Sequence, residues 1–166
     1  MHIPELSSQV ELLGNLLSAK KYTLGTAESC TGGLISSMLT DVSGSSAWFI
    51  GAVVAYSNTI KQAVLHVPED TLIAHGAVSE ETALAMVSGA RNALDVDIAV
   101  SVTGIAGPTG GTPDKPVGTV WIGYSIGTNT FAQHHIFEGT RSDVRYQTAF
   151  AAITTLLQEV DKLSAK

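Results

Sequence analysis

The apolar positions of this chain alternate between the spacing of helices and that of strands. Near the N-terminus, Leu6, Val10, Leu13 and Leu17 recur every three or four residues, which predicts a helix over residues 4–20. Short apolar runs further along predict strands, and turns rich in glycine, serine and asparagine separate them.

The remaining elements follow from the same pattern. Strands are predicted at residues 23–27, 48–56, 98–103, 120–126 and 130–137, and helices at 34–39, 58–66, 69–75, after Ser79 and from about Arg141. The 48–56 run, WFIGAVVAY, has the apolar character of a buried strand. Helices between the early strands and a hairpin near the end predict an α/β fold, a three-layer α/β/α sandwich with a mixed sheet. We expect residues 1–166 to form a single domain.

Composition narrows the classes of partner. Charged residues make up only 14% of the chain, below the usual quarter, which predicts surface shared with another copy in a homo-oligomer. The net charge of −6 argues against nucleic acid and anionic membranes as partners. One cysteine and an N-terminus without the apolar core of a signal peptide predict a cytoplasmic protein.

The segment TAESCTGG at residues 26–33 lies where a predicted strand passes into a helix. Such a junction exposes Ser29 and directs free helix N–H groups toward whatever its hydroxyl attacks, as in an oxyanion hole. Gly32 and Gly33 allow a ligand to approach the backbone closely. The competing interpretation is that Ser29 or Thr31 only caps the helix.

Two further side chains bear on a nucleophile at this turn. Cys30 is a rival to Ser29, because a helix N-terminus lowers a thiol pKa, although a small buried residue is its commoner role. None of the five histidines stands in a recognisable triad or metal-ligand motif. Lys61 follows a second strand-to-helix junction and is the candidate base of a Ser–Lys enzyme; a solvated helix lysine is the alternative.

A glycine-rich loop and two arginines suggest an anion site. The loop at residues 103–111, TGIAGPTGG, lacks bulky side chains and is expected to face a ligand, although it matches no phosphate-loop motif and an ordinary wide turn stays possible. Arg141 and Arg145 lie near the start of the last helix, where cations oppose the helix dipole, so an anion between them is predicted. Pairing with Asp143 is the alternative.

Six motifs follow one another along the chain: TAESCTGG at 26–33, GSSAWF…AYSN…K at 44–61, HGAVSEE at 75–81, SVTGIAGPTGG at 101–111, KPVGTVW at 115–121 and F-x-G-x-R-x-x-V-R at 137–145. Together they resemble the CinA C-terminal domain family over nearly the whole chain. The stand-alone members of that family are nicotinamide-nucleotide amidases. The resemblance implies hydrolysis of nicotinamide mononucleotide to nicotinic acid mononucleotide and ammonia, as a step in NAD recycling.

The resemblance also implies roles for single residues. Ser29 matches the nucleophile, Lys61 the lysine, Tyr56 the tyrosine, Thr103 the polar residue of the glycine-rich stretch and Arg145 the terminal arginine. We expect Lys61, assisted by Tyr56, to deprotonate Ser29, with no metal or organic cofactor. The residues expected to bind substrate are Cys30, Thr31, Gly32, Gly33, Thr103, Gly104, Ala106, Gly107, Arg141 and Arg145.

Two alternatives keep the same fold. One is a catalytically inactive, regulatory nucleotide-binding module, in which Lys61 is an ordinary surface residue. The other is a different hydrolase, either an amidase of another heteroaromatic amide or a nucleotide pyrophosphatase. A pyrophosphatase needs a divalent metal, and the sequence shows no carboxylate cluster to hold one.

Overall fold

The computed structural model describes residues 3–166, and side chains from residue 6 onward. The helices are α1 (Ile3–Lys20), α2 (Leu34–Thr40), α3 (Asn58–Ala63), α4 (Glu69–His75), α5 (Glu80–Leu94) and α6 (Arg141–Asp161). The strands are β1 (Leu24–Glu28), β2 (Phe49–Val54), β3 (Ile98–Gly104), β4 (Thr119–Ile126) and β5 (Asn129–Ile136), and a short 3₁₀ turn spans Ser45–Ala47.

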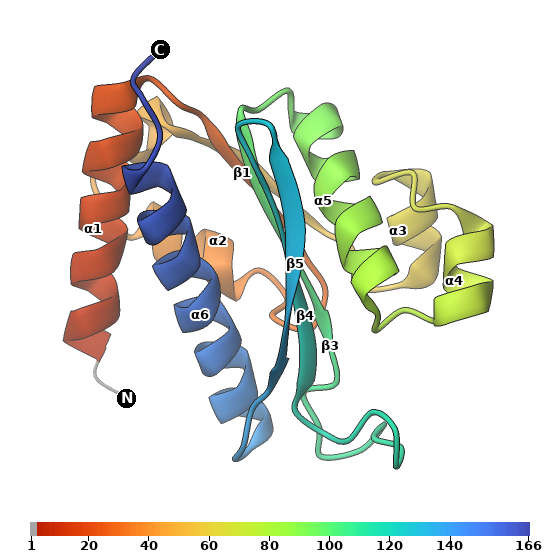
Figure 1. Cartoon of the computed structure of the whole chain (residues 1–166). Coiled ribbons are helices and arrows are strands. Elements are labelled where there is room, and N and C mark those ends of the chain that lie inside the picture. Colours follow the sequence, from red (N-terminus) through yellow and green to blue (C-terminus); the bar gives the residue numbers. More distant parts are fainter. Residues whose placement is uncertain (1–2) are drawn as a thin grey trace.

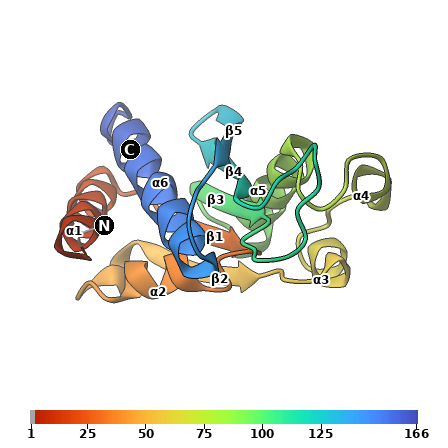
Figure 2. The same cartoon turned by 90° about the horizontal axis from the view of Figure 1, so that it is seen from below.

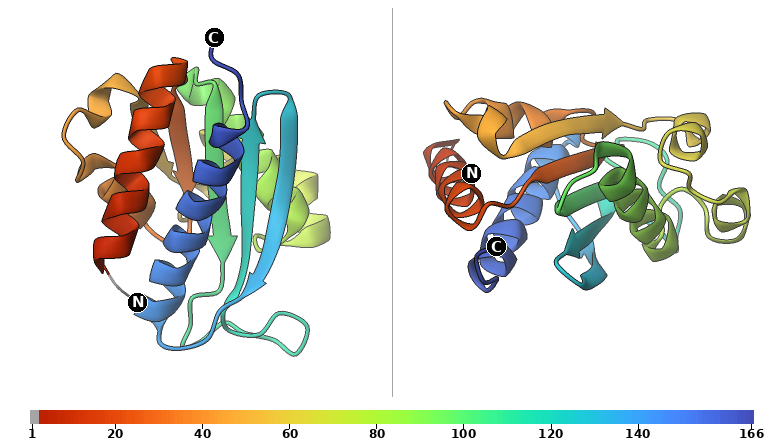
Figure 3. Two further views of the ribbon diagram at one scale, coloured as in Figure 1. Left: turned by 60° about the vertical axis from the view of Figure 1, so that its left-hand side comes forward. Right: turned by 90° about the horizontal axis from the view of Figure 1, so that it is seen from above.

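The five strands form one mixed sheet in the order β2-β1-β3-β4-β5. β1 is parallel to both β2 and β3, while β4 and β5 add antiparallel to β3 as a hairpin. Helices α1, α2 and α6 cover one face of the sheet, and α5, with α3 and α4 beside it, covers the other (Figure 1). The views along the sheet show the same three layers, which confirms the predicted α/β/α architecture (Figures 2 and 3).

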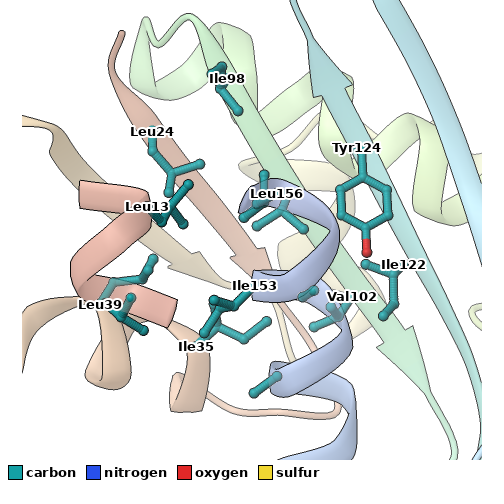
Figure 4. Close-up of a cluster of buried hydrophobic side chains, with 14 of the residues drawn as sticks. Leu13, Leu24, Ile35, Leu39, Ile98, Val102, Ile122, Tyr124, Ile153 and Leu156 are labelled. Atoms are coloured by element: carbon teal, nitrogen blue, oxygen red, sulfur yellow. The ribbon is translucent and has the colours of Figure 1, made fainter. Parts of the chain in front are cut away.

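The larger hydrophobic core lies between the sheet and the layer of α1, α2 and α6 (Figure 4). The predicted stripe of α1, from Leu6 to Leu17, is buried there, together with Ile153 and Leu156 of α6. A smaller core lies under α5, where Met86 packs toward the opposite face of the sheet. Both faces of β1, β3 and β4 are therefore covered, which accounts for the burial of nearly every residue in these strands.

A strand does form within residues 48–56, but the prediction that it is buried was wrong. Within the described part of the chain, β2 is an edge strand that pairs only with β1, and its residues alternate between half-buried and exposed. Leu24 pairs with Phe49 and Gly25 with Gly51, so Ile50 is the extra residue of a bulge and its side chain is exposed. An apolar run indicates a strand, but it does not show whether that strand has a neighbouring strand on both sides.

Helix α3 is also shorter than predicted. It ends at Ala63 instead of His66, because His66 takes a left-handed conformation with φ of 54° and Pro68 follows. The predicted cap at Ser79 is confirmed, since its side chain accepts a hydrogen bond from the Thr82 N–H. The alternative that Ser29 or Thr31 caps α2 is wrong, because Gly33 is the N-cap of that helix. No helix among residues 3–166 is both long and apolar enough to cross a membrane.

The parallel arrangement of β2, β1 and β3 determines where chemistry can occur. Their carboxyl ends meet at one edge of the sheet, and the segments that follow them begin at Ser29, Ala55 and Ile105. Ligands of open α/β sheets bind beyond this edge. All the residues expected to act in catalysis follow one of these three strands or lie at its end.

Candidate active site

Ser29 and Lys61 are brought together at the carboxyl edge of the sheet. The Ser29 backbone N–H donates to the Val102 carbonyl, which holds the residue against the end of β3. The Lys61 Nζ donates to Ser29 Oγ at 3.1 Å and to the Ala55 carbonyl at 3.0 Å. Ser29 is 7% exposed and Lys61 only 2%. Lys61 is therefore not the solvated helix lysine of the alternative interpretation.

Burial changes the acid–base character of this lysine. Desolvation lowers the pKa of Lys61 from its ordinary value of 10.5, because an ammonium loses hydration when it leaves water. A lowered pKa increases the neutral fraction, and a neutral amine can accept the proton of a serine hydroxyl. Among residues 3–166, no histidine lines this pocket, and Lys61 is the basic side chain in contact with Ser29.

The turn after Ser29 is organised by Glu28, a residue that the sequence analysis missed. Both carboxylate oxygens of Glu28 are occupied, accepting from the N–H groups of Gly33, Ile35 and Ser36 at 2.8–3.0 Å and from the Thr31 hydroxyl at 2.7 Å. An acid at the end of the strand that leads into α2 was the available signal, since the helix dipole favours a negative charge near the helix N-terminus.

This arrangement corrects the expected oxyanion hole. The Gly33, Ile35 and Ser36 N–H groups at the start of α2 donate to Glu28. The Leu34 N–H donates to the Thr31 carbonyl, and the Gly32 N–H donates to the Ser29 carbonyl. Gly32 and Gly33 take left-handed conformations, with φ of 59° and 95°, that let the chain turn tightly into α2. Their role in the structure is to form the turn, and neither lines the pocket.

Cys30 lines the pocket, but its thiol is not in the reactive thiolate form. Its thiol is buried, and burial raises its pKa to about 12, so almost none of it is thiolate at neutral pH. The structure therefore favours Ser29 over Cys30 as the nucleophile of this turn.

The pocket in front of Ser29 has a volume of about 200 Å³. Of the predicted residues it brings together eight, and it leaves out Thr31, Gly32, Gly33, Gly107 and Arg145. The Thr103 hydroxyl donates to the Ala77 carbonyl at 2.6 Å, which joins two residues of the pocket wall. The lining residues are Ser29, Cys30, Tyr56, Asn58, Lys61, Ala77, Val78, Thr103, Gly104, Ala106 and Arg141.

Asn58, Ala77 and Val78 were not predicted. Asn58 opens α3 and lies three residues before Lys61, so the same junction supplies both. Ala77 and Val78 belong to the connection between α4 and α5, which local sequence does not relate to Ser29. The packing of α5 against β3 brings this connection to the pocket, where Ala77 accepts from Thr103 and Val78 from Lys115.

The two arginines predicted to share an anion have different hydrogen-bond partners. Arg141 lines the pocket and donates to the Gly107 carbonyl at 2.8 Å and to the Tyr56 hydroxyl at 3.1 Å. Arg145 instead donates from Nε and Nη2 to the Thr31 carbonyl, at 3.2 and 2.6 Å. The two do not enclose one anion site in this structure.

One expected contact and one alternative pairing are not found in the structure. Tyr56 is 63% exposed, and its hydroxyl pairs with Arg141 rather than with Lys61. Asp143 does not pair with the arginines, because it forms a capping box with Thr140 at the start of α6. Within the described chain, no group of three histidine, cysteine or acidic side chains has the arrangement of a metal site.

Comparisons with known proteins agree on one family. The model of the CinA C-terminal domain matches residues 6–160. The nicotinamide-nucleotide amidohydrolase PncC of Escherichia coli K12 is 45% identical over 156 residues, which cover 93% of this chain and 94% of that protein. A CinA-like protein of Salinibacter ruber is 53% identical over 131 residues, covering 79% of this chain. The chain spans only about a third of the length of such CinA-like relatives.

Solved structures show the same fold. A CinA superfamily protein of Klebsiella pneumoniae superposes with a TM-score of 0.91 at 32% identity, covering 95% of this chain and 99% of that one. The competence/damage-inducible protein of Agrobacterium tumefaciens superposes with a TM-score of 0.88 at 36% identity, covering 95% and 96%.

Proposed function

The chain belongs to the CinA C-terminal domain family, and on that premise we propose that it hydrolyses nicotinamide mononucleotide to nicotinic acid mononucleotide and ammonia. The observation that carries the proposal is the buried Lys61 amine 3.1 Å from the Ser29 hydroxyl, at the base of a pocket. The relative named for this amidohydrolase reaction matches the chain over nearly its full length, which supports the substrate. We place the reaction in the cytoplasm, in pyridine nucleotide recycling by a single-domain enzyme.

The first step is acyl transfer to Ser29. Neutral Lys61 takes the hydroxyl proton as Oγ attacks the carboxamide carbon, and the carbonyl oxygen becomes an oxyanion. The Cys30 N–H, at the pocket, is the donor we assign to that oxyanion, because Gly32 and Gly33 donate elsewhere. The protonated Lys61 then gives its proton to the leaving nitrogen, the C–N bond breaks and ammonia departs.

The second step returns the enzyme to its starting state. Lys61 removes a proton from water, whose oxygen attacks the ester carbon. The bond to Ser29 Oγ breaks, and that oxygen regains the proton from Lys61. Nicotinic acid mononucleotide leaves with its new carboxylate. The cycle uses one water per turnover and requires no metal or organic cofactor.

The pocket dimensions indicate how the substrate lies. A volume of about 200 Å³ is below the usual range of about 300–1,000 Å³ for sites that enclose a whole ligand. We therefore place the pyridine ring and carboxamide inside, with the ribose and phosphate passing outward over the hydrogen-bonded pair of Tyr56 and Arg141. The Arg141 guanidinium is the cation at this mouth and is assigned to the phosphate.

Ammonia release from nicotinamide mononucleotide tests the proposal. Ser29→Ala is expected to abolish turnover while retaining binding, and the exposed Ser88→Ala on α5 serves as the matched control. Near-normal ammonia release by Ser29→Ala removes Ser29 from the nucleophile role. Binding without turnover by the natural chain favours the inactive, regulatory nucleotide-binding module instead.

We also propose a homo-oligomer built on the open edge of the sheet. The unpaired edge strand β2 exposes Ile50 and Val54, and the neighbouring α3 exposes Ile60 and Val64. Exposed apolar side chains along an unpaired edge are typical of an interface. Light scattering after size exclusion is expected to show an oligomer that Ile50→Glu dissociates; a monomeric natural chain contradicts the proposal.

A further inference from the structure

The turn that carries Ser29 is held from two sides through one residue, Thr31. On the inner side, the Thr31 hydroxyl donates to the Glu28 carboxylate at 2.7 Å. On the outer side, the Thr31 carbonyl accepts from Arg145 Nε and Nη2 at 3.2 and 2.6 Å. Thr31 itself is buried and does not line the pocket. Its two polar groups are therefore used for holding the turn.

Glu28 is the more deeply placed of the two partners. Its side chain is 0% exposed, and all four of its hydrogen bonds come from residues 31–36 of the turn and α2. A buried carboxylate is tolerated only when its oxygens are hydrogen-bonded, and charged acceptors form the stronger bonds. Glu28 thus links the end of β1 to the start of α2, on either side of Ser29.

Arg145 reaches the same turn from the neighbouring helix α6. A Cβ built at Gly32 lies 3.8 Å from Arg145 Nη2, so the guanidinium lies directly over the turn. The pocket lining includes Arg141 but not Arg145. Arg145 therefore contacts the turn that carries Ser29, whereas Arg141 lines the pocket that the substrate is proposed to enter.

We propose that Glu28 and Arg145 are positioning residues, which hold the turn between them and thereby fix the Ser29 hydroxyl against Lys61. The inference rests on the proposed function and changes the role of Arg145 from binding substrate to positioning the nucleophile. A small displacement of Oγ from the amine weakens both the attack and the proton transfer, and a shift of about 1 Å can cost about 100-fold in rate.

The kinetic test separates positioning from phosphate binding. Arg145→Ala is expected to lower kcat for nicotinamide mononucleotide by about 10- to 100-fold with KM nearly unchanged, and Arg145→Lys to recover part of the loss. Arg141→Ala is expected to raise KM instead. The exposed neighbour Tyr146→Phe is the matched control on α6. An Arg145→Ala variant that raises KM and keeps kcat overturns the proposal.

A second measurement does not depend on the nucleotide. A fluorophosphonate probe labels an activated serine, and the rate of Ser29 labelling is expected to fall in Arg145→Ala and in Glu28→Gln. If Glu28→Gln does not fold, Thr31→Val keeps the shape of the threonine and removes one bond to Glu28. Labelling at the natural rate in both Thr31→Val and Arg145→Ala overturns the proposal. Absence of ammonia release by the natural chain contradicts the proposed function alone, because the labelling comparison still reports on the turn.

Discussion

The Lys61 amine lies 3.1 Å from the Ser29 hydroxyl oxygen, and both residues are buried. Burial lowers the pKa of Lys61 below 10.5, and only the neutral amine can accept the serine proton. The rate kcat/KM is therefore expected to rise with pH through the folded-state pKa of Lys61 and to level off before 10.5. Lys61→Arg stays charged and is expected to lose at least about 100-fold. A flat pH profile contradicts the role of Lys61 as base.

The same shift in pKa predicts a pH-dependent stability. Between the lowered folded-state pKa and the unfolded value of 10.5, the unfolded chain binds more protons, so the free energy of unfolding rises with pH in that window. Lys61→Met removes this dependence. Its stability relative to the natural chain is expected to be most favourable below the folded-state pKa and to decline toward pH 10.5.

Urea unfolding at several pH values measures this difference. Lys162→Met, at an exposed lysine paired with Glu159, is the control and is expected to show no such trend over the same range. A stability difference between Lys61→Met and the natural chain that does not change with pH rules out the depressed pKa.

Cys30 is expected to resist alkylation in the folded protein. Its buried thiol has a pKa raised to about 12, so the reactive thiolate is scarce at neutral pH and access is poor. Iodoacetamide should modify Cys30 rapidly in urea and slowly in buffer, with ammonia release retained in buffer over the same time. Rapid alkylation and inactivation of the folded protein would restore Cys30 as a rival nucleophile.

Ser29 and Lys61 could be found from the sequence because each follows an apolar run. The ends of such runs can be recognised locally, and parallel strands bring their carboxyl ends together. The open edge of β2 could not be found in this way, since Ile50 and Val54 are as apolar as residues of a buried strand. Whether a strand lies at the edge or in the centre of a sheet depends on the strand order, which is a property of the whole fold.

The difference between the two arginines was also beyond the sequence. Arg141 and Arg145 lie one helical turn apart, and spacing alone predicts a shared anion. The structure separates them because the Thr31 carbonyl lies within reach of Arg145, and that contact depends on how α6 packs over the turn. Glu28 was missed for a similar reason: its donors are the Thr31 hydroxyl and the N–H groups of Gly33, Ile35 and Ser36, which point at it only after the glycine turn has formed.

Gly89 tests the packing of α5. Alanine is a better helix former than glycine by about 1 kcal/mol, so propensity alone predicts that Gly89→Ala stabilises the protein. A Cβ at this position would lie 1.9 Å from the Leu65 carbonyl oxygen, which is backbone and cannot move aside easily. We expect the clash to prevail, with a net loss of about 1–3 kcal/mol. Urea unfolding measures it, with the exposed Ser88→Ala as control; a more stable Gly89→Ala contradicts the close contact.

Lys20 joins the end of the first helix to the end of the last. Its Nζ donates to the carbonyls of Val160, Asp161 and Leu163 at 3.0, 2.6 and 2.6 Å. The last carbonyls of a helix lack partners within it, and a cation beside them also complements the helix dipole. Lys20→Met keeps the aliphatic stem and removes the donors, so we expect a loss of about 1–3 kcal/mol in the free energy of unfolding.

The adjacent Lys21→Met is the matched control, because Lys21 is exposed. Ammonia release at a temperature where both variants are folded is expected to match that of the natural chain, since Lys20 contacts the end of α6 opposite to Arg141. Equal unfolding free energies for Lys20→Met and Lys21→Met would show that water replaces the ammonium at these carbonyls without cost. A selective loss of activity in Lys20→Met would instead show that the C-terminal end of α6 affects the position of its first turn at the pocket.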